Sequence, residues 1–220
     1  MGVMVMNKSE TTVIISCAGM GTRLGIGMPK ALVDIAGKPL IIRQLEMLQE
    51  YSDVRIVVGF QAGKVIKTVQ QFRRNLTFAF NYDYKTTGTA ASFSKGLIGA
   101  KKFVVALDGD LLVRPDDFQK ILCSEGEVIG GTVPTTDNPV LMMLDEKHNV
   151  IGFSRETGTL EWTGLAKIKR DRLSPGAGHV YQMLEPLLPI QACEIHTREI
   201  DTVNDYENAV KWIQNNYQEL

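Results

Sequence analysis

The sequence has few of the residues that mark a secreted, membrane or nucleic-acid-binding protein. Its 220 residues include only three cysteines, and this odd, widely spaced set predicts reduced thiols rather than a disulfide framework or a zinc site. The net charge of −1 gives no basic excess for nucleic acid. No apolar run could span a bilayer, and the apolar start, residues 1–6, is too short for a signal peptide. We therefore expect a cytoplasmic protein without nucleic-acid or membrane partners.

One local basic cluster is present, formed by Lys167, Lys169, Arg170 and Arg172 and diluted by Asp171. We interpret it as a solvated loop. The remaining composition is ordinary, with 44% hydrophobic and 22% charged residues. The length suits one sizeable core, so we expect a single domain, residues 1–220.

Buried strands alternate with amphipathic helices over the first 131 residues. We expect strands at 11–15, 54–60, 76–82 and 102–107. Three helices are expected between them: one begins at Pro39, the next has Val65, Val69 and Phe72 on its apolar face, and the third begins at Gly88. This alternation predicts a parallel sheet with helices on both faces. Ligands of such sheets bind outside the carboxyl ends of the strands.

The pattern is weaker beyond residue 131. We expect strands at 127–133, 140–144, 150–154, 165–169 and 192–196, some of them antiparallel, and a helix at 179–188. The last helix is predicted from Val203, Tyr206, Val210, Ile213 and Tyr217 on one face, with Thr202 as its N-cap and Asp205 three residues on. We expect this part to lie on the same sheet as the first.

A glycine-rich segment follows the first predicted strand. Gly19, Gly21, Gly25 and Gly27 leave its backbone free to curl, so that its amides can bind a polyphosphate. Arg23 and Lys30 add two cations that suit phosphate oxygens. The spacing is neither that of a Rossmann turn, because Leu24 takes the third glycine's place, nor that of a Walker loop, because Pro39 follows Gly37-Lys38. A flexible surface loop is the alternative.

Three motifs together resemble the signature of the sugar-nucleotidyltransferase superfamily: Ala18-Gly19-Met20-Gly21-Thr22-Arg23-Leu24, Pro29-Lys30-Ala31-Leu32 and Gly37-Lys38-Pro39-Leu40-Ile41. The resemblance implies a single-domain Rossmann-like (GT-A-like) three-layer α/β fold with a mixed, mostly parallel sheet. It also implies that residues 10–131 bind the nucleotide and residues 132–220 the acceptor. The residues it assigns to the nucleotide are Ala18, Gly19, Gly21, Thr22, Arg23, Gly88, Thr89 and Asp108. Gly88 and Thr89 also suit a helix start capped by Thr86 or Thr87.

Two aspartates follow the predicted strand 102–107. On an extended chain, Asp108 and Asp110 would point to one side, and Gly109 between them would admit a ligand. Two carboxylates facing a triphosphate loop suit Mg²⁺, although aspartates also form turns after strands. The resemblance adds Asp201 as a third metal contact, where helix capping is the alternative role.

The resemblance implies a Mg²⁺-dependent nucleotidyltransferase with Arg23 and Lys30 as catalytic residues. The short chain is similar to compact cytidylyltransferases, so CTP is the expected nucleotide and the acceptor a phospho-alcohol such as phosphocholine or glycerol phosphate, a phosphonate or a sugar 1-phosphate. Gly88-Thr89-Ala90 looks more like sugar-1-phosphate uridylyl- and guanylyltransferases, which keeps a sugar-1-phosphate uridylyl-, guanylyl- or thymidylyltransferase as an alternative. Synthesis of nucleotide sugars for surface polysaccharides is the implied setting.

Glu161, Trp162 and Tyr181 are our candidates for contacting the acceptor, and Trp162 suits the core or the pocket rim equally well. An aromatic cage for a trimethylammonium group could use Trp162, Tyr181 and Tyr84. Two other classes stay open, a GT-A glycosyltransferase that uses Asp108-Gly109-Asp110 and a non-catalytic nucleotide-binding subunit. A homodimer is also left open.

Overall fold

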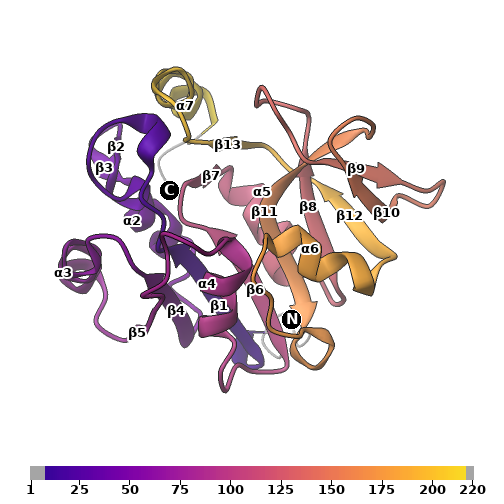
Figure 1. Ribbon diagram of the computed structural model, residues 1–220, viewed down its shortest axis with the longest axis horizontal. Coiled ribbons are helices and arrows are strands. Elements are labelled where there is room, and N and C mark those ends of the chain that lie inside the picture. The colour runs from indigo at the N-terminus through magenta and orange to yellow at the C-terminus, as the bar shows by residue number, and fades with distance from the viewer. Residues whose placement is uncertain (1–7, 217–220) are drawn as a thin grey trace.

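Strand β1 (Thr11–Cys17) lies inside a nine-stranded sheet and is buried on both faces (Figure 1). The computed structural model describes residues 8–216. Val13 and Ile15 of β1 pack into the core on one face, and Ile14 between them packs into the core on the other. A strand buried on both faces has a continuous apolar run, which is why the sequence predicts this strand so well.

The sheet order is β5–β4–β1–β6–β11–β8–β12–β10–β9. Its strands are β4 (Asp53–Val58), β5 (Thr77–Phe80), β6 (Phe103–Asp108), β8 (Val128–Thr132), β9 (Leu141–Leu144), β10 (Asn149–Ser154), β11 (Leu160–Lys169) and β12 (Ile190–Glu194). The first four in the order are parallel, and so are β8 and β12, whereas β10 and β11 are antiparallel to their neighbours. The α/β class and the mixed sheet are confirmed. The predicted, mostly parallel pairing applies to the four strands from β5 to β6, whereas beyond β6 only β8 and β12 pair in parallel.

Helices cover both faces of this sheet (Figure 1). One core cluster includes residues of α2 (Leu40–Glu46), α3 (Ala62–Phe72) and α5 (Pro115–Cys123), and the other includes residues of α4 (Thr89–Gly96) and α6 (Val180–Leu184). Short 3₁₀ turns occupy Thr22–Leu24, Lys30–Leu32, Arg170–Arg172 and Glu185–Leu187, and β2 (Asp34–Ile35) pairs with β3 (Lys38–Pro39). The three layers agree with the predicted architecture.

Several local expectations need correction. Phe72, predicted on the buried face of α3, is 40% exposed. The helix expected at 179–188 ends as α-helix at Leu184 and tightens into the 3₁₀ turn Glu185–Leu187, which contains Pro186. Helix α4 has Gly88 as its N-cap, without a capping hydrogen bond from Thr86 or Thr87.

Helix α7 (Val203–Asn216) packs with Ile35, Leu112 and Ile200 in a third apolar cluster. Thr202 and Asp205 cap it as predicted, because Asp205 N donates to Thr202 Oγ1 while Thr202 N donates to Asp205 Oδ2. Tyr217 lies outside the described residues. Within residues 8–216, no helix has both the length and the apolar character needed to cross a bilayer. Cys17, Cys123 and Cys193 are free thiols, as expected.

A separate two-stranded ladder joins distant parts of the chain. Strand β7 (Leu111–Val113) is antiparallel to β13 (Thr197–Glu199), with Leu111 opposite Glu199. Ile200 N donates to Asp110 O at 3.1 Å, which extends the ladder by one hydrogen bond. Residues 110 and 199–201 are therefore held side by side.

Asp117 ties the start of α5 to the segment that leads into β13. Its carboxylate is fully buried and accepts hydrogen bonds from His196 N (2.9 Å), His196 Nδ1 (2.7 Å), Arg114 Nη2 (3.0 Å) and Lys120 Nζ (2.6 Å). Burial alone would raise the pKa of Asp117, but the hydrogen bonds from Lys120 and His196 lower it to about 2. The ionised form of Asp117 therefore stabilises the fold.

We expect this carboxylate to make stability depend on pH. Because its folded pKa lies below the unfolded value, its contribution is complete above about pH 4 and is lost as the pH falls towards 2, a change of about 2 kcal/mol. Asp117→Asn should lower the free energy of unfolding at pH 6 and flatten this dependence in urea titrations between pH 2.5 and 6. Asp116→Asn, at the exposed neighbouring position, is the control. Parallel pH profiles for wild type and Asp117→Asn would contradict the assignment.

The interpretation of the basic cluster as a solvated loop is wrong for Lys167. This lysine lies within β11 with 0% exposure, and its Nζ donates to Leu122 O (2.9 Å) and Ser124 O (2.5 Å) at the end of α5. A cation there satisfies the free carbonyls of a helix end. Burial lowers the pKa of Lys167 to about 8.

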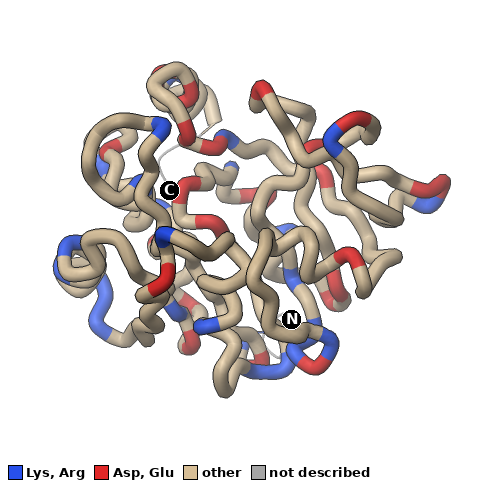
Figure 2. Tube along the Cα trace, in the orientation of Figure 1, with Lys and Arg blue, Asp and Glu red and all other residues tan. Residues whose placement is uncertain are grey.

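Figure 2 shows acidic and basic residues interspersed along the chain trace in this view, without a stripe of either sign.

Candidate active site

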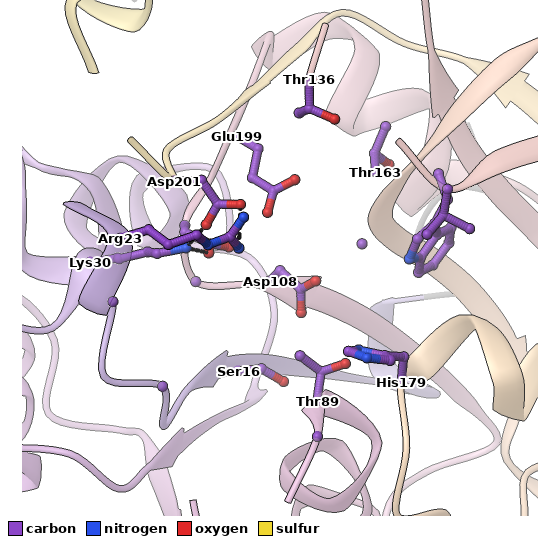
Figure 3. Close-up of a pocket in the computed structure, with 18 of the residues that line it drawn as sticks. Ser16, Arg23, Lys30, Thr89, Asp108, Thr136, Thr163, His179, Glu199 and Asp201 are labelled. Atoms are coloured by element: carbon purple, nitrogen blue, oxygen red, sulfur yellow. Dashed lines mark hydrogen bonds and ion pairs between the residues drawn. The ribbon is translucent and has the colours of Figure 1, made fainter. Parts of the chain in front are cut away.

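All the site residues predicted from the sequence line one cavity of about 590 Å³ (Figure 3). These are Ala18, Gly19, Gly21, Thr22, Arg23, Lys30, Gly88, Thr89, Asp108, Asp110, Glu161, Trp162, Tyr181 and Asp201. The cavity lies at the carboxyl ends of the parallel strands β1 and β6. Residues from both predicted halves thus face one space.

The glycine-rich loop brings the Lys30 side chain across its own backbone. Gly21 has a φ of +60°, and a Cβ built on it would lie 2.7 Å from Lys30 Cγ. Glycine is required here both for the left-handed backbone and for the passage of the lysine stem. The loop therefore fixes the direction in which Lys30 enters the cavity.

The two cations of the loop meet the acidic residues directly (Figure 3). Lys30 Nζ lies 2.7 Å from Asp110 Oδ2 and also pairs with Asp201, while Arg23 Nη2 lies 2.6 Å from Asp201 Oδ2. Burial would lower the pKa of Lys30, but Asp110 and Asp201 raise it overall above its ordinary value. Lys30 is therefore a permanent cation that shares one space with the Asp110 carboxylate.

Glu199 is a site residue that the sequence reasoning did not single out. One carboxylate oxygen from each of Asp110, Glu199 and Asp201 lies within 4.8 Å of the others. Burial, then Asp110 and Asp201, raise the pKa of Glu199 to about 9. The available signal was the spacing of Glu199 from Asp201, which lies two residues on and directly before the last predicted helix.

The donor set of this cluster fits a hard divalent cation. Three carboxylates within one small space supply the oxygen ligands that Mg²⁺ prefers. Burial first, and then the neighbouring Asp110 and Asp201, outweigh Lys30 in raising the pKa of Glu199, as expected where carboxylates crowd together. Asp110, Glu199 and Asp201 are thus the residues that could hold a metal.

Asp108 lies outside this three-carboxylate cluster. It is the last residue of β6, whereas Asp110 lies in the turn that follows, so the alternation of a strand does not relate their side chains. Asp108 faces Gly164 of β11, on which a Cβ would lie 2.3 Å from Asp108 Oδ2. Burial and the nearby Asp110 raise the pKa of Asp108 to about 8.

Gly88 and Gly109, expected to admit a ligand, make close approaches to the chain itself. A Cβ on Gly109 would lie 2.6 Å from Cys17 Sγ, and one on Gly88 would lie 2.1 Å from Gly178 O. Gly88 N donates to Ala177 O (3.1 Å) at the start of α4. The chain itself therefore occupies the space beside this helix start, although Gly88 still lines the cavity.

Figure 3 shows Thr163 and His179 across the cavity from Arg23 and Lys30, and the candidate acceptor residues Trp162 and Tyr181 are neighbours of these two. Glu161, only 4% exposed, accepts hydrogen bonds from Thr135 N (2.7 Å), Thr136 N (3.3 Å) and Thr136 Oγ1. Its carboxylate therefore holds the 135–136 segment at the cavity wall. Trp162 and Tyr181 both contact the ring of Phe153. Tyr84 also lines the cavity, and its ring pairs with that of Phe60, with centroids 6.3 Å apart.

Comparison with known proteins identifies the family of the chain. The MobA-like NTP transferase domain matches residues 13–157. The bifunctional protein GlmU of Methanococcus maripaludis (strain C7) is 28% identical over 194 residues, which cover 83% of this chain and 44% of that protein. The chain therefore spans less than half the length of this relative.

Two solved structures share the fold. The CTP:phosphocholine cytidylyltransferase of Streptococcus pneumoniae superposes with a TM-score of 0.75 at 21% identity, over 93% of this chain and 99% of that one. The inositol-1-phosphate CTP transferase of T. maritima gives 0.78 at 16% identity, over 96% and 99%. The family match includes the glycine-rich loop, Lys30 and Asp110. The resemblance found in the sequence is confirmed, and the chain belongs to the MobA-like NTP transferase domain family of nucleotidyltransferases.

Proposed function

We propose that the chain transfers a nucleotidyl group from a nucleoside triphosphate, CTP first, to a small phosphorylated acceptor. An acceptor oxygen bonds to the α-phosphorus, the bond from that phosphorus to the bridging α–β oxygen breaks, and pyrophosphate leaves. The observation that carries this proposal is the shared space of Lys30 and the Asp110 carboxylate beside the glycine-rich loop. The similar solved structures that use CTP support the choice of nucleotide.

The residues of the cavity supply positioning and charge. A phosphate monoester is already an oxyanion near neutral pH, because its second pKa is about 6, so the reaction requires no side chain to activate it. Lys30 is placed to offset charge on the α-phosphate, and Arg23 charge on the β- and γ-phosphates. Asp110, Glu199 and Asp201 would hold Mg²⁺, which when bound supplies Lewis-acid stabilisation of the phosphate oxygens.

The cavity divides between the two substrates in this proposal. Residues 10–131 contribute the loop, Gly88, Thr89 and Asp108 to the nucleotide. Residues 132–220 contribute Trp162 and Tyr181 to the acceptor, with Glu161 acting through the 135–136 segment. A phospho-alcohol, a phosphonate and a sugar 1-phosphate are the acceptor classes to compare.

A pyrophosphate-release assay tests the proposal. CTP, UTP, GTP, ATP and dTTP are each combined with phosphocholine, glycerol 3-phosphate, a phosphonate and glucose 1-phosphate, with Mg²⁺ or with EDTA. We expect acceptor-dependent pyrophosphate release with Mg²⁺ and at least a 100-fold loss with EDTA. Transfer from a nucleotide sugar with release of a nucleoside diphosphate would indicate a glycosyltransferase instead. Nucleotide binding without any product would indicate a non-catalytic subunit.

A further inference from the structure

Several polar side chains in the acceptor part of the cavity are already paired within the protein. Glu161 is occupied by Thr135 and Thr136, and Thr163 Oγ1 donates to Gly130 O at 2.9 Å. Arg155, at the same part of the cavity, donates from Nη1 to Asn138 O at 2.8 Å. Recognition of a sugar requires several free donors and acceptors, because each sugar hydroxyl removed from water must be paired. The groups that could do this are largely paired within the protein.

Aromatic rings form the remaining wall. Trp162 and Tyr181 both line the cavity, and both contact the ring of Phe153, with centroids 6.0 Å and 5.5 Å from it. Phe153 and Trp162 pack against the apolar core beneath. The His179 ring stacks on Tyr181 at 5.8 Å with an interplanar angle of 8°. These contacts hold the aromatic wall in place before any ligand binds.

The surroundings of this wall also suit a cation. Among the described acidic residues that line the cavity, Asp110, Glu199 and Asp201 form the cluster assigned to the metal, whereas Glu161 precedes Trp162 directly in the chain. Lys30 and Arg23 lie at the phosphate end and are already paired with Asp110 and Asp201. A cation is attracted to the faces of Trp and Tyr rings, so it fits this wall without competing for the paired groups at the phosphate end.

We infer that the acceptor is a phosphate ester whose other end is an organic cation, an ammonium or quaternary ammonium group held against Trp162 and Tyr181. This inference rests on the proposed function and names its substrate class. The phosphate end faces Lys30 and the acidic cluster, while the cationic end lies at the aromatic wall. A sugar 1-phosphate acceptor is disfavoured because its hydroxyls would meet rings and paired groups.

The test compares two acceptors of the same shape. Phosphocholine carries a trimethylammonium group, and 3,3-dimethylbutyl phosphate replaces its nitrogen by carbon without the charge. We expect kcat/KM for phosphocholine to exceed that for the neutral ester by at least 10-fold, mainly through KM. Trp162→Leu should reduce this ratio towards one, Trp162→Phe should keep part of it, and Tyr82→Ala, at an exposed ring outside the cavity lining, should leave it unchanged.

Each other outcome is decisive. Equal use of the two esters, or preferred use of glucose 1-phosphate, would overturn the inference while leaving nucleotidyl transfer intact. A loss of turnover in Arg155→Met equal to that in Trp162→Leu would indicate an anionic acceptor end and would also overturn it. Absence of pyrophosphate release with every acceptor and nucleotide would overturn the proposed function, and the inference with it. Thermal unfolding of each variant separates these results from loss of folding.

Discussion

Replacement of Lys30 by methionine is expected to lower kcat for pyrophosphate release by 10²–10³-fold. The lysine side chain reaches the cavity across Gly21 and pairs with Asp110 and Asp201. Among the ion pairs of residues 8–216, it is the one that brings a cation to Asp110. Removing one preorganised group that stabilises developing charge costs this much in other enzymes. The methionine keeps the packing of the stem, and Arg23 still pairs with Asp201, so we expect the fold to persist.

Lys38→Met is the matched control for Lys30→Met. Lys38 pairs with Glu46 at 2.5 Å on a half-exposed surface, outside the cavity lining, and such a pair contributes little to stability. Pyrophosphate release and thermal unfolding are measured for both variants. Near-normal kcat in a folded Lys30→Met protein would contradict the role given to Lys30 at the α-phosphate.

Gly164→Ala is expected to destabilise the fold by about 2–5 kcal/mol and to reduce activity at least 10-fold. A left-handed backbone costs alanine about 1–2 kcal/mol, and overpacking adds about 1–3 kcal/mol. Gly164 has a φ of +78°, and its new Cβ would lie 2.3 Å from Asp108 Oδ2. Either the irregular part of β11 or the Asp108 side chain must move, and both line the cavity.

Gly99→Ala separates the two contributions. Gly99 has a similar φ of +65°, but a Cβ there would meet nothing within 4 Å. We therefore expect Gly99→Ala to cost only the backbone term and to leave activity unchanged. Urea unfolding gives the free energies of both variants, and the pyrophosphate assay gives their rates. Equal destabilisation by the two substitutions would show that Asp108 and β11 accommodate the methyl group.

The parts of the fold that the sequence predicts well are those where local pattern and burial agree. β1 is apolar on both faces because helices cover both sides of the sheet, and α7 begins where Thr202 and Asp205 cap it. The antiparallel strands beyond residue 131 are harder to predict from the sequence, because their register depends on partners far away in the chain. The α/β fold class can be predicted from the alternation of strands and helices alone, whereas the pairing of the strands depends on the tertiary structure.

The residues that sequence reasoning misjudged depend on distant partners. Lys167 looks like a surface cation, but its position in β11 directs it to the carbonyls at the end of α5. Asp108 and Asp110 look like a strand pair, but the strand ends between them. Glu199 joins the acidic cluster only because β13 pairs with β7. None of these arrangements follows from spacing alone.

The ladder of β7 and β13 has a consequence for the newly made protein. The glycine-rich loop, Lys30 and Asp110 leave the ribosome before Glu199 and Asp201, which reach Asp110 only when β13 has paired with β7. A nascent chain therefore carries its loop cations without the complete set of carboxylates. Until β13 has paired with β7, such a chain lacks the complete three-carboxylate cluster to which we assign the metal of the proposed reaction.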